Sequence, residues 1–145
     1  MDALSVRHKG EGIVIAEVTM EYILLIYTDE EEASNFTPED VEGHAAAFGE
    51  YVRELMARGV LRGGAPLQPT SVSTTVNVRG GKTLTTDGTF LETKEALAGF
   101  YHLECKDLDE AIELAAKIPA ATAGTIEVRP VWEEMVGLVG KHAGM

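Results

Sequence analysis

Residues 86 to 131 read TDGTFLETKEALAGFYHLECKDLDEAIELAAKIPAATAGTIEVRPV, and the patterns of a turn, a strand, a helix and a strand follow one another there without a gap. Asp87-Gly88 is a turn pair, because Asp bonds its own backbone and Gly accepts positive φ. Residues 98–105 alternate as a strand, with Phe100, His102 and Glu104 on one face. A capped helix over 107–118 and a strand over 125–131 complete the stretch.

Upstream of this stretch the pattern predicts another strand, a long helix and a hairpin. Residues 22–27 are continuously apolar, which is typical of a central strand buried on both faces. The acidic run 29–32 is expected to be a solvated loop. Residues 60–64 form a short strand that bends at its glycines. The alternation over 71–79, the Gly80-Gly81 turn and residues 82–86 predict a β-hairpin arm.

The helix is predicted from Pro38 to Arg58. Thr37 is its N-cap, Pro38 occupies the first helical position, and Gly59 ends it. Phe36 is placed to pack onto Val41. The apolar stripe expected to face the sheet consists of Val41, Ala45, Phe48, Val52, Leu55 and Met56.

This order of elements predicts an α+β fold of the ferredoxin-like βαββαβ type with an inserted β-hairpin. Both helices are expected on one face of a mainly antiparallel sheet. Nothing in the chain is left to cover the other face. We therefore expect a homodimer formed through that sheet face.

Composition limits the partners that fit. A chain of 145 residues suits a single domain, and its formal net charge of −12 repels phosphate backbones and anionic lipid headgroups. Nucleic acid and membrane surfaces are therefore not expected as partners. Cys105 is the single cysteine and has no internal disulfide partner, so a reducing, cytoplasmic location is expected.

The domain is expected over residues 20–135, with a C-terminal tail over 136–145. For residues 1–19 three interpretations stay open: a loose tail, an extra edge strand from Gly12 to Val18, or an extension upstream of a natural start at Met20. The loose tail is preferred, because termini are usually poorly ordered unless something holds them. The segment fits neither a signal peptide nor a membrane span.

Several of these motifs resemble the YCII-related family, in particular the branch named after its DGPF motif. That motif stands here as Asp87-Gly88-Thr89-Phe90, with Thr89 in place of proline. The similarity covers nearly everything after Met20. Further matching positions are residues 22–27, His44, Gly63-Gly64, Glu92-Thr93-Lys94-Glu95, Gly99-Phe100-Tyr101, Asp107-Leu108-Asp109-Glu110-Ala111 and Val128-Arg129-Pro130-Val131.

The resemblance implies a dimeric α+β barrel, in which two ferredoxin-like sheets face each other. It implies no reaction, because the DGPF branch has no settled activity. In shorter YCII-type members a His and an Asp are proposed as a catalytic pair. His44 is similar to that His, whereas Met56 or Ala57 stands near the position of the Asp.

His44 and Asp87 are the candidate catalytic residues. As a general base, His44 needs a carboxylate to fix its tautomer, and Asp87, brought in by the hairpin, is the candidate replacement. If the arm folds over the helix margin, the two side chains meet within hydrogen-bond reach. In the alternative, His44 only packs and Asp87 only forms its turn.

The candidate ligand-binding residues are Arg129, Glu127, Tyr27, Tyr101 and His102. Buried in a barrel, Arg129 can bind a carboxylate or an enolate in a forked geometry. The alternative is an ion pair between Glu127 and Arg129, two residues apart on one strand. No metal site is predicted, because the four histidines have no close-spaced ligand partners, and no cofactor is predicted.

Two classes of function remain open. In the first, the dimer encloses a pocket that binds a small polar or aromatic metabolite, with or without proton chemistry. In the second, it is a non-catalytic interaction or regulatory module, in which the polar strand residues only join two sheets.

Overall fold

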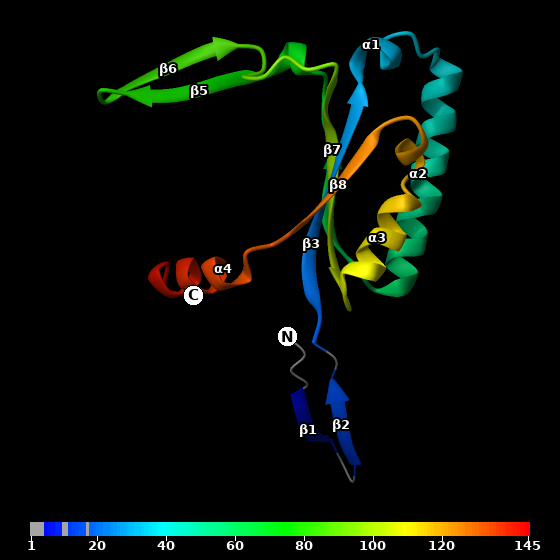
Figure 1. The fold of residues 1–145 in the computed structure, drawn as a ribbon, viewed down its shortest axis with the longest axis vertical. Helices are drawn as coiled ribbons and strands as arrows, with labels where there is room; N and C mark the ends of the chain where they lie inside the picture. The colour runs from blue at the N-terminus through cyan, green and yellow to red at the C-terminus, as the bar shows by residue number, and fades with distance from the viewer. Residues whose placement is uncertain (1–4, 10–11, 17) are drawn as a thin grey trace.

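The computed structural model describes residues 5–9, 12–16 and 18–145. Near the N-terminus, β1 (Ser5–Lys9) and β2 (Gly12–Ala16) pair antiparallel as a small sheet of their own (Figure 1). The extra strand expected from Gly12 is thus present, but it pairs with β1 and not with the edge of the main sheet. The loose extension over residues 1–19 stays a prediction, and residues 1–4, 10–11 and 17 lie outside the described residues.

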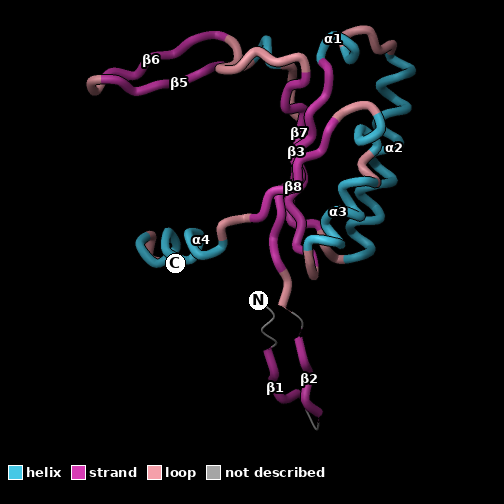
Figure 2. Tube along the Cα trace, in the orientation of Figure 1, coloured by secondary structure: helices cyan, strands magenta, loops and turns pink. Residues whose placement is uncertain are grey.

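Four antiparallel strands form the main sheet in the order β4-β7-β3-β8 (Figures 1 and 2). This is the strand order of a ferredoxin-like βαββαβ unit, so the predicted α+β class is confirmed. β3 is a central strand, as expected. The strands are β3 (Met20–Asp29), β4 (Leu61–Pro66), β7 (Glu95–Cys105) and β8 (Thr125–Pro130).

Two helices, α2 (Pro38–Arg58) and α3 (Leu108–Ala116), cover one face of the sheet (Figure 1). The hydroxyl of Tyr51 on α2 donates a 2.8 Å hydrogen bond to the carbonyl of Leu114 on α3, which ties the two helices together. The apolar contacts between helices and sheet supply most of the stabilisation. Their buried residues are Tyr22, Leu24, Ile26, Tyr51, Leu55, Val60, Leu103, Cys105, Ala111, Leu114, Ala115 and Ile118.

The ends of α2 follow their local signals. The Thr37 side chain accepts a hydrogen bond from the Asp40 amide, and the Asp40 carboxylate accepts one from the Thr37 amide. Gly59 ends the helix in the left-handed conformation at φ 70°. The predicted bounds are therefore confirmed.

The predicted apolar stripe of α2 is partly wrong. Val41 and Met56 are 55% and 65% exposed, whereas Tyr51 is buried. Residues 38–46 are all exposed, so only the later turns of α2 pack on the sheet. Phe36 lies against the His44 ring, with 4.5 Å between the ring centroids.

Two appendages project from the other side of the sheet (Figure 1). One is the predicted hairpin of β5 (Thr74–Arg79) and β6 (Lys82–Asp87), which is named the arm below. The other is α4 (Glu133–His142), so most of the segment expected as a C-terminal tail is helical. Both leave the same sheet face, near its opposite ends.

Two further expectations need correction. The acidic run is not a loop but a short helix, α1 (Glu30–Ala33), because the Asp29 side chain accepts a hydrogen bond from the Glu31 amide at its start. β3 is buried on only one face: Tyr22, Leu24 and Ile26 are buried, and the residues between them are partly exposed. Short 3-10 turns lie at Thr70–Val72 and Pro119–Thr122.

No helix in the described part of the chain combines the length and the apolar character that a membrane crossing requires.

Candidate functional site

The sheet face opposite α2 and α3, named the open face below, carries most of the residues that the sequence singled out. Its centre is apolar, since Leu25 pairs with Phe100 and Ile23 lies beside His102 in the register of β3 and β7. These side chains are partly buried. None of the described helices packs on this face, which lies between the arm and α4 (Figure 1).

The first polar cluster of the open face joins Tyr27, Glu127 and Arg129. Arg129 Nε donates to Glu127 Oε2 at 2.8 Å, and the Tyr27 hydroxyl donates to Glu127 Oε1 at 3.5 Å. The hydrogen bond to Glu127 raises the pKa of Arg129 above its ordinary value. In the single chain, the guanidinium of Arg129 is therefore already paired with the carboxylate of Glu127 on the same strand, as in the ion-pair alternative.

The second polar cluster lies at the other end of the same face. His102 Nε2 is 2.6 Å from Glu21 Oε1, and Arg62 Nε donates to Glu104 Oε1 at 2.9 Å. The Thr19 hydroxyl also donates to Glu104. The hydrogen bonds from Thr19 and Arg62 hold the pKa of Glu104 below its usual value. Each carboxylate in the two clusters thus has a partner within its own chain.

Tyr101, one of the predicted ligand-binding residues, lies on the opposite face. Its ring meets that of Tyr51 on α2 edge to face, with 5.3 Å between centroids. Burial raises the pKa of its hydroxyl. Tyr101 therefore packs beneath the helices and does not share a surface with Tyr27 or His102.

The structure does not bring His44 and Asp87 together within one chain. His44 is exposed on α2, where its ring lies against Phe36. Asp87 is exposed at the end of β6, and it pairs with Thr74 across the arm. The arm and α2 lie on opposite sides of the sheet (Figure 1). Proton chemistry by this pair stays a prediction that the single chain does not support.

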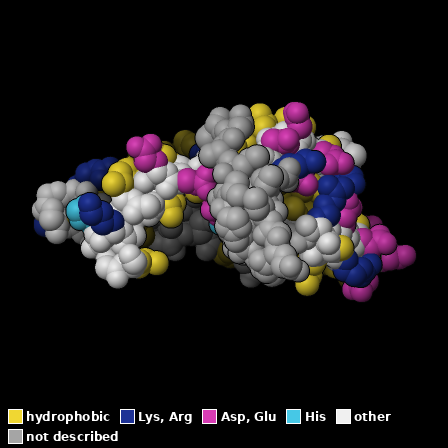
Figure 3. All heavy atoms as spheres, turned by 90° about the horizontal axis from the view of Figure 1, so that it is seen from below, with side chains coloured by type: hydrophobic (Ala, Val, Ile, Leu, Met, Phe, Trp, Pro, Cys, Tyr) yellow, Lys and Arg dark blue, Asp and Glu magenta, His cyan; other side chains and the backbone are white. Residues whose placement is uncertain are grey.

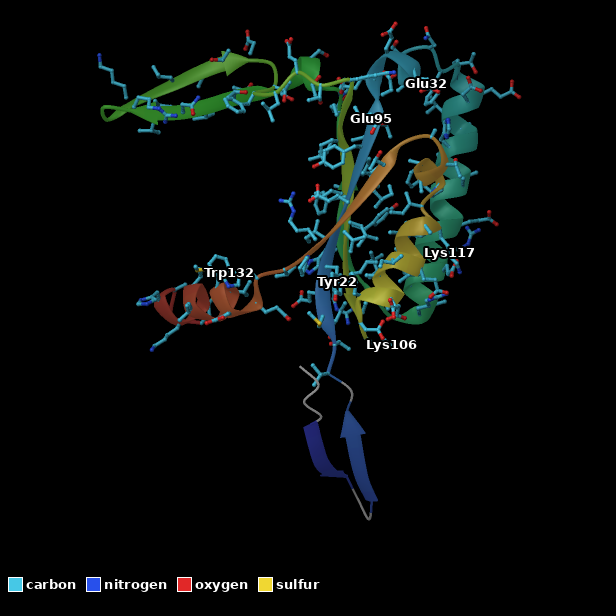
Figure 4. All side chains as sticks on the ribbon, in the orientation of Figure 1. Tyr22, Glu32, Glu95, Lys106, Lys117 and Trp132 are labelled. Atoms are coloured by element: carbon cyan, nitrogen blue, oxygen red, sulfur yellow. The ribbon has the colours of Figure 1, made fainter. Side chains whose placement is uncertain are left out.

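A cavity of about 640 Å³ lies at the root of the arm, which the sequence did not indicate. Tyr27 and Leu97 contribute to it from the sheet, and Glu95 lies at the arm end of β7 (Figure 4). Through its hydroxyl, Tyr27 also reaches the first polar cluster. Ala96 also contributes from β7. The rest of the lining comes from the connections before and after the arm, and consists of Leu67, Gln68, Pro69, Thr70, Val72, Ser73, Thr89, Leu91 and Thr93.

Hydrogen bonds hold the arm root in place. Glu30 of α1 accepts from the Thr70 amide at 2.8 Å and also from the Thr70 hydroxyl. The Gly88 amide donates to the Ser73 carbonyl at 2.7 Å, and the Thr75 hydroxyl donates to the Gly88 carbonyl at 2.8 Å. Gly88 has φ 98°, which glycine adopts readily. The predicted Asp87-Gly88 turn therefore closes the arm where the cavity begins.

No group of three or more His, Cys, Asp or Glu side chains suited to a metal ion occurs in the described part of the chain. In Figure 3 charged side chains of both signs and hydrophobic side chains appear both on the helical side at the right and on the projecting part at the left.

Comparison with known proteins places this architecture in a family. The family model of the YCII-related domain matches residues 20–135. The chain belongs to the YCII-related family. A second finding agrees: an uncharacterised protein of Rhizobium meliloti (strain 1021) is 37% identical over 114 residues, which cover 77% of this chain and 92% of that relative. The matched YCII-related region runs from the start of β3 into α4 and includes the cavity and both polar clusters apart from Thr19.

Proposed function

We propose that this YCII-related protein works as a homodimeric α+β barrel, a binding module in which the open faces of two chains pack on each other around a small-molecule site. The observation that carries the proposal is an open sheet face flanked by two projecting elements, the arm and α4. Apolar residues of a sheet are stabilised when another layer covers them, and in the part of the chain that the structure describes only one face of this sheet is covered by helices.

Exposed apolar side chains on the same side of the molecule support this. Trp132, just before α4, is 65% exposed, and Val136 and Val139 on α4 are 60% and 57% exposed. Near the arm root, Phe90 is 77% exposed. Large exposed apolar side chains that gather on one side of a molecule are typical of an interface. An isologous contact between two open faces brings both appendages of each chain toward the partner.

The charges of the open face also suit burial. A net charge of −12 per chain opposes association unless the contact region is locally neutral. Here Glu104 is paired with Arg62, Glu127 with Arg129, and Glu21 with His102. Carboxylates that already have partners cost less to bury than unpaired ones.

We also propose that the chain belongs to the DGPF branch of the family. The motif Asp87-Gly88-Thr89-Phe90 has a structural role that explains its residue types. Gly88 closes the arm, Thr89 lines the cavity, and Phe90 projects from the chain. The motif thus joins the arm, the cavity and the exposed apolar surface, which suits a binding module better than a catalytic pair.

Sedimentation velocity at micromolar concentration tests the dimer. We expect a species of twice the 15.6 kDa chain mass. A monomer at all accessible concentrations would contradict the proposal, because the open face would then remain exposed to water.

A further inference from the structure

The cavity at the arm root is lined by one chain, so its chemistry can be analysed without a partner. It has a volume of about 640 Å³, which is in the range of sites for small metabolites. Leu67, Val72, Leu91 and Leu97 give it apolar walls. Such walls favour a ligand with an apolar body of several carbon atoms.

The polar side chains of the cavity are hydroxyls, the amide of Gln68 and one carboxylate. Tyr27, Thr70, Ser73, Thr89 and Thr93 contribute hydroxyls, whereas no Lys, Arg or His belongs to the lining that the described residues form. Glu95 supplies the carboxylate. Hydroxyls accept as well as donate hydrogen bonds, so this set serves a donor group on the ligand.

One carboxylate oxygen of Glu95 is hydrogen-bonded within the described chain, and the other is available to a ligand. The Thr125 hydroxyl donates to its Oε1 at 2.9 Å. Its Oε2 receives no hydrogen bond from any residue of the described chain, although Glu95 is partly buried. A carboxylate oxygen at the edge of an apolar cavity attracts a cationic donor more strongly than a neutral one.

Neighbouring residues strengthen the negative potential at this position. Glu30 lies behind Thr70 and accepts two hydrogen bonds from it. Glu127 lies behind Tyr27, where Arg129 balances its charge. Glu95 in the wall and Glu30 behind Thr70 therefore place two carboxylates at this cavity, an arrangement that disfavours anions such as carboxylates and phosphates.

We infer that this cavity binds a small organic cation, an amine whose ammonium group pairs with Glu95 and whose apolar body lies against Leu91 and Leu97. The inference adds a ligand class to the proposed binding module. It differs from the anion site expected at Arg129, because Arg129 does not line the cavity and is already paired with Glu127.

Three probes of similar size separate the effect of the ligand's charge on binding from the effect of its shape. They are phenethylamine, phenethyl alcohol and hydrocinnamate. Each is titrated into the isotope-labelled, full-length protein while amide chemical shifts are followed by NMR. We expect phenethylamine to bind most tightly, with the largest shifts at Thr89, Leu91 and Leu97. Hydrocinnamate is expected to give no saturable shifts at these positions.

Glu95→Gln tests the contact itself, because the amide oxygen can still accept from Thr125 while the charge is lost. We expect phenethylamine to bind at least about fivefold more weakly to this variant, as a partly exposed charged hydrogen bond predicts. Glu92→Gln makes the same change of net charge outside the lining, and affinity should stay within about twofold of wild type.

Leu91→Ala removes part of the apolar wall at an exposed position and should weaken both the amine and the alcohol. Equal binding of amine and carboxylate, shifts confined to residues outside the cavity, or full affinity in Glu95→Gln would overturn the inference. These results are independent of the sedimentation experiment, so the proposal of an amine ligand and the proposal of a dimer can be refuted separately.

Discussion

Phe100→Ala tests how much the open face contributes to association. Phe100 lies at the centre of that face, opposite Leu25, and is partly buried in the single chain. Roughly a quarter of the ~200 Å² of an aromatic side chain, about 50 Å², is left for a partner to cover. At ~25 cal/mol per Å² this burial stabilises the dimer by about 1.2 kcal/mol per chain.

A two-fold interface contains the substitution twice, so the loss is about 2.5 kcal/mol per dimer. With 1.4 kcal/mol for each factor of ten, the dissociation constant should rise roughly fiftyfold. A hole left in the packed interface would add to this loss. Phe100→Asp should prevent association, because a carboxylate without a partner in a dry interface costs several kcal/mol.

Sedimentation equilibrium measures the dissociation constant, and the single tryptophan supplies a second signal. Trp132 is 65% exposed in the single chain, so its emission should move to shorter wavelength as dimers form. The matched control is Ile112→Ala, which truncates a side chain 50% exposed on α3, on the helical side. If Phe100→Ala and Ile112→Ala give the same dissociation constant as wild type, the open face is not the interface.

Three further predictions concern the fold. Gly99→Ala should lower the melting temperature, because the new Cβ would lie 2.9 Å from the carbonyl oxygen of Ala65 on the neighbouring strand β4. The control Gly43→Ala meets nothing within 4 Å and should raise the melting temperature by removing a glycine from a helix interior. Equal melting temperatures for the two variants would contradict the strand contact. Burial raises the pKa of the Cys105 thiol from 9.0 to about 11, so between these pH values the folded chain keeps a proton that the unfolded chain loses. The free energy of unfolding should therefore fall as the pH rises from 9.0 to about 11. Iodoacetamide should label the folded thiol at least about a hundredfold more slowly than the unfolded one, and equal rates would show that Cys105 is not buried. Tyr51→Phe removes one of the two donors to the buried Leu114 carbonyl, which keeps the 3.2 Å hydrogen bond from the Lys117 amide, and should destabilise the chain by about 0.5–1.5 kcal/mol in urea unfolding, a loss that would be absent if the two helices were held by apolar contacts alone.

Signals that act over a few residues were readable from the sequence. Thr37, Pro38 and Gly59 gave the bounds of α2, because caps and left-handed glycines act within one helical turn. Strand alternation also predicted the correct face for Tyr101. Because Tyr101 lies between Phe100 and His102, its side chain points to the opposite face, toward the helices. The prediction that Tyr101 lines the same binding site as Tyr27 and His102 did not take this alternation into account.

Features that depend on the path of the chain in space were not readable. Asp87 lies at the end of an arm whose direction is set by contacts at its root, such as Glu30 with Thr70, and nothing near Asp87 encodes that direction. The cavity is assembled from both connections of the same arm and was missed for that reason. α4 was missed because Gly137 and Gly140 weaken a helical pattern that its apolar residues would otherwise show.

The most direct test of the central claim is an isotope-filtered NOE experiment on a sample mixed from labelled and unlabelled chains, which detects only contacts between two copies. We expect intermolecular NOEs from the methyl groups of Ile23 and Leu25 and from the ring of Phe100. Intermolecular NOEs confined to the outer surfaces of α2 and α3 would contradict it, since the open face would then not be the surface that two chains share.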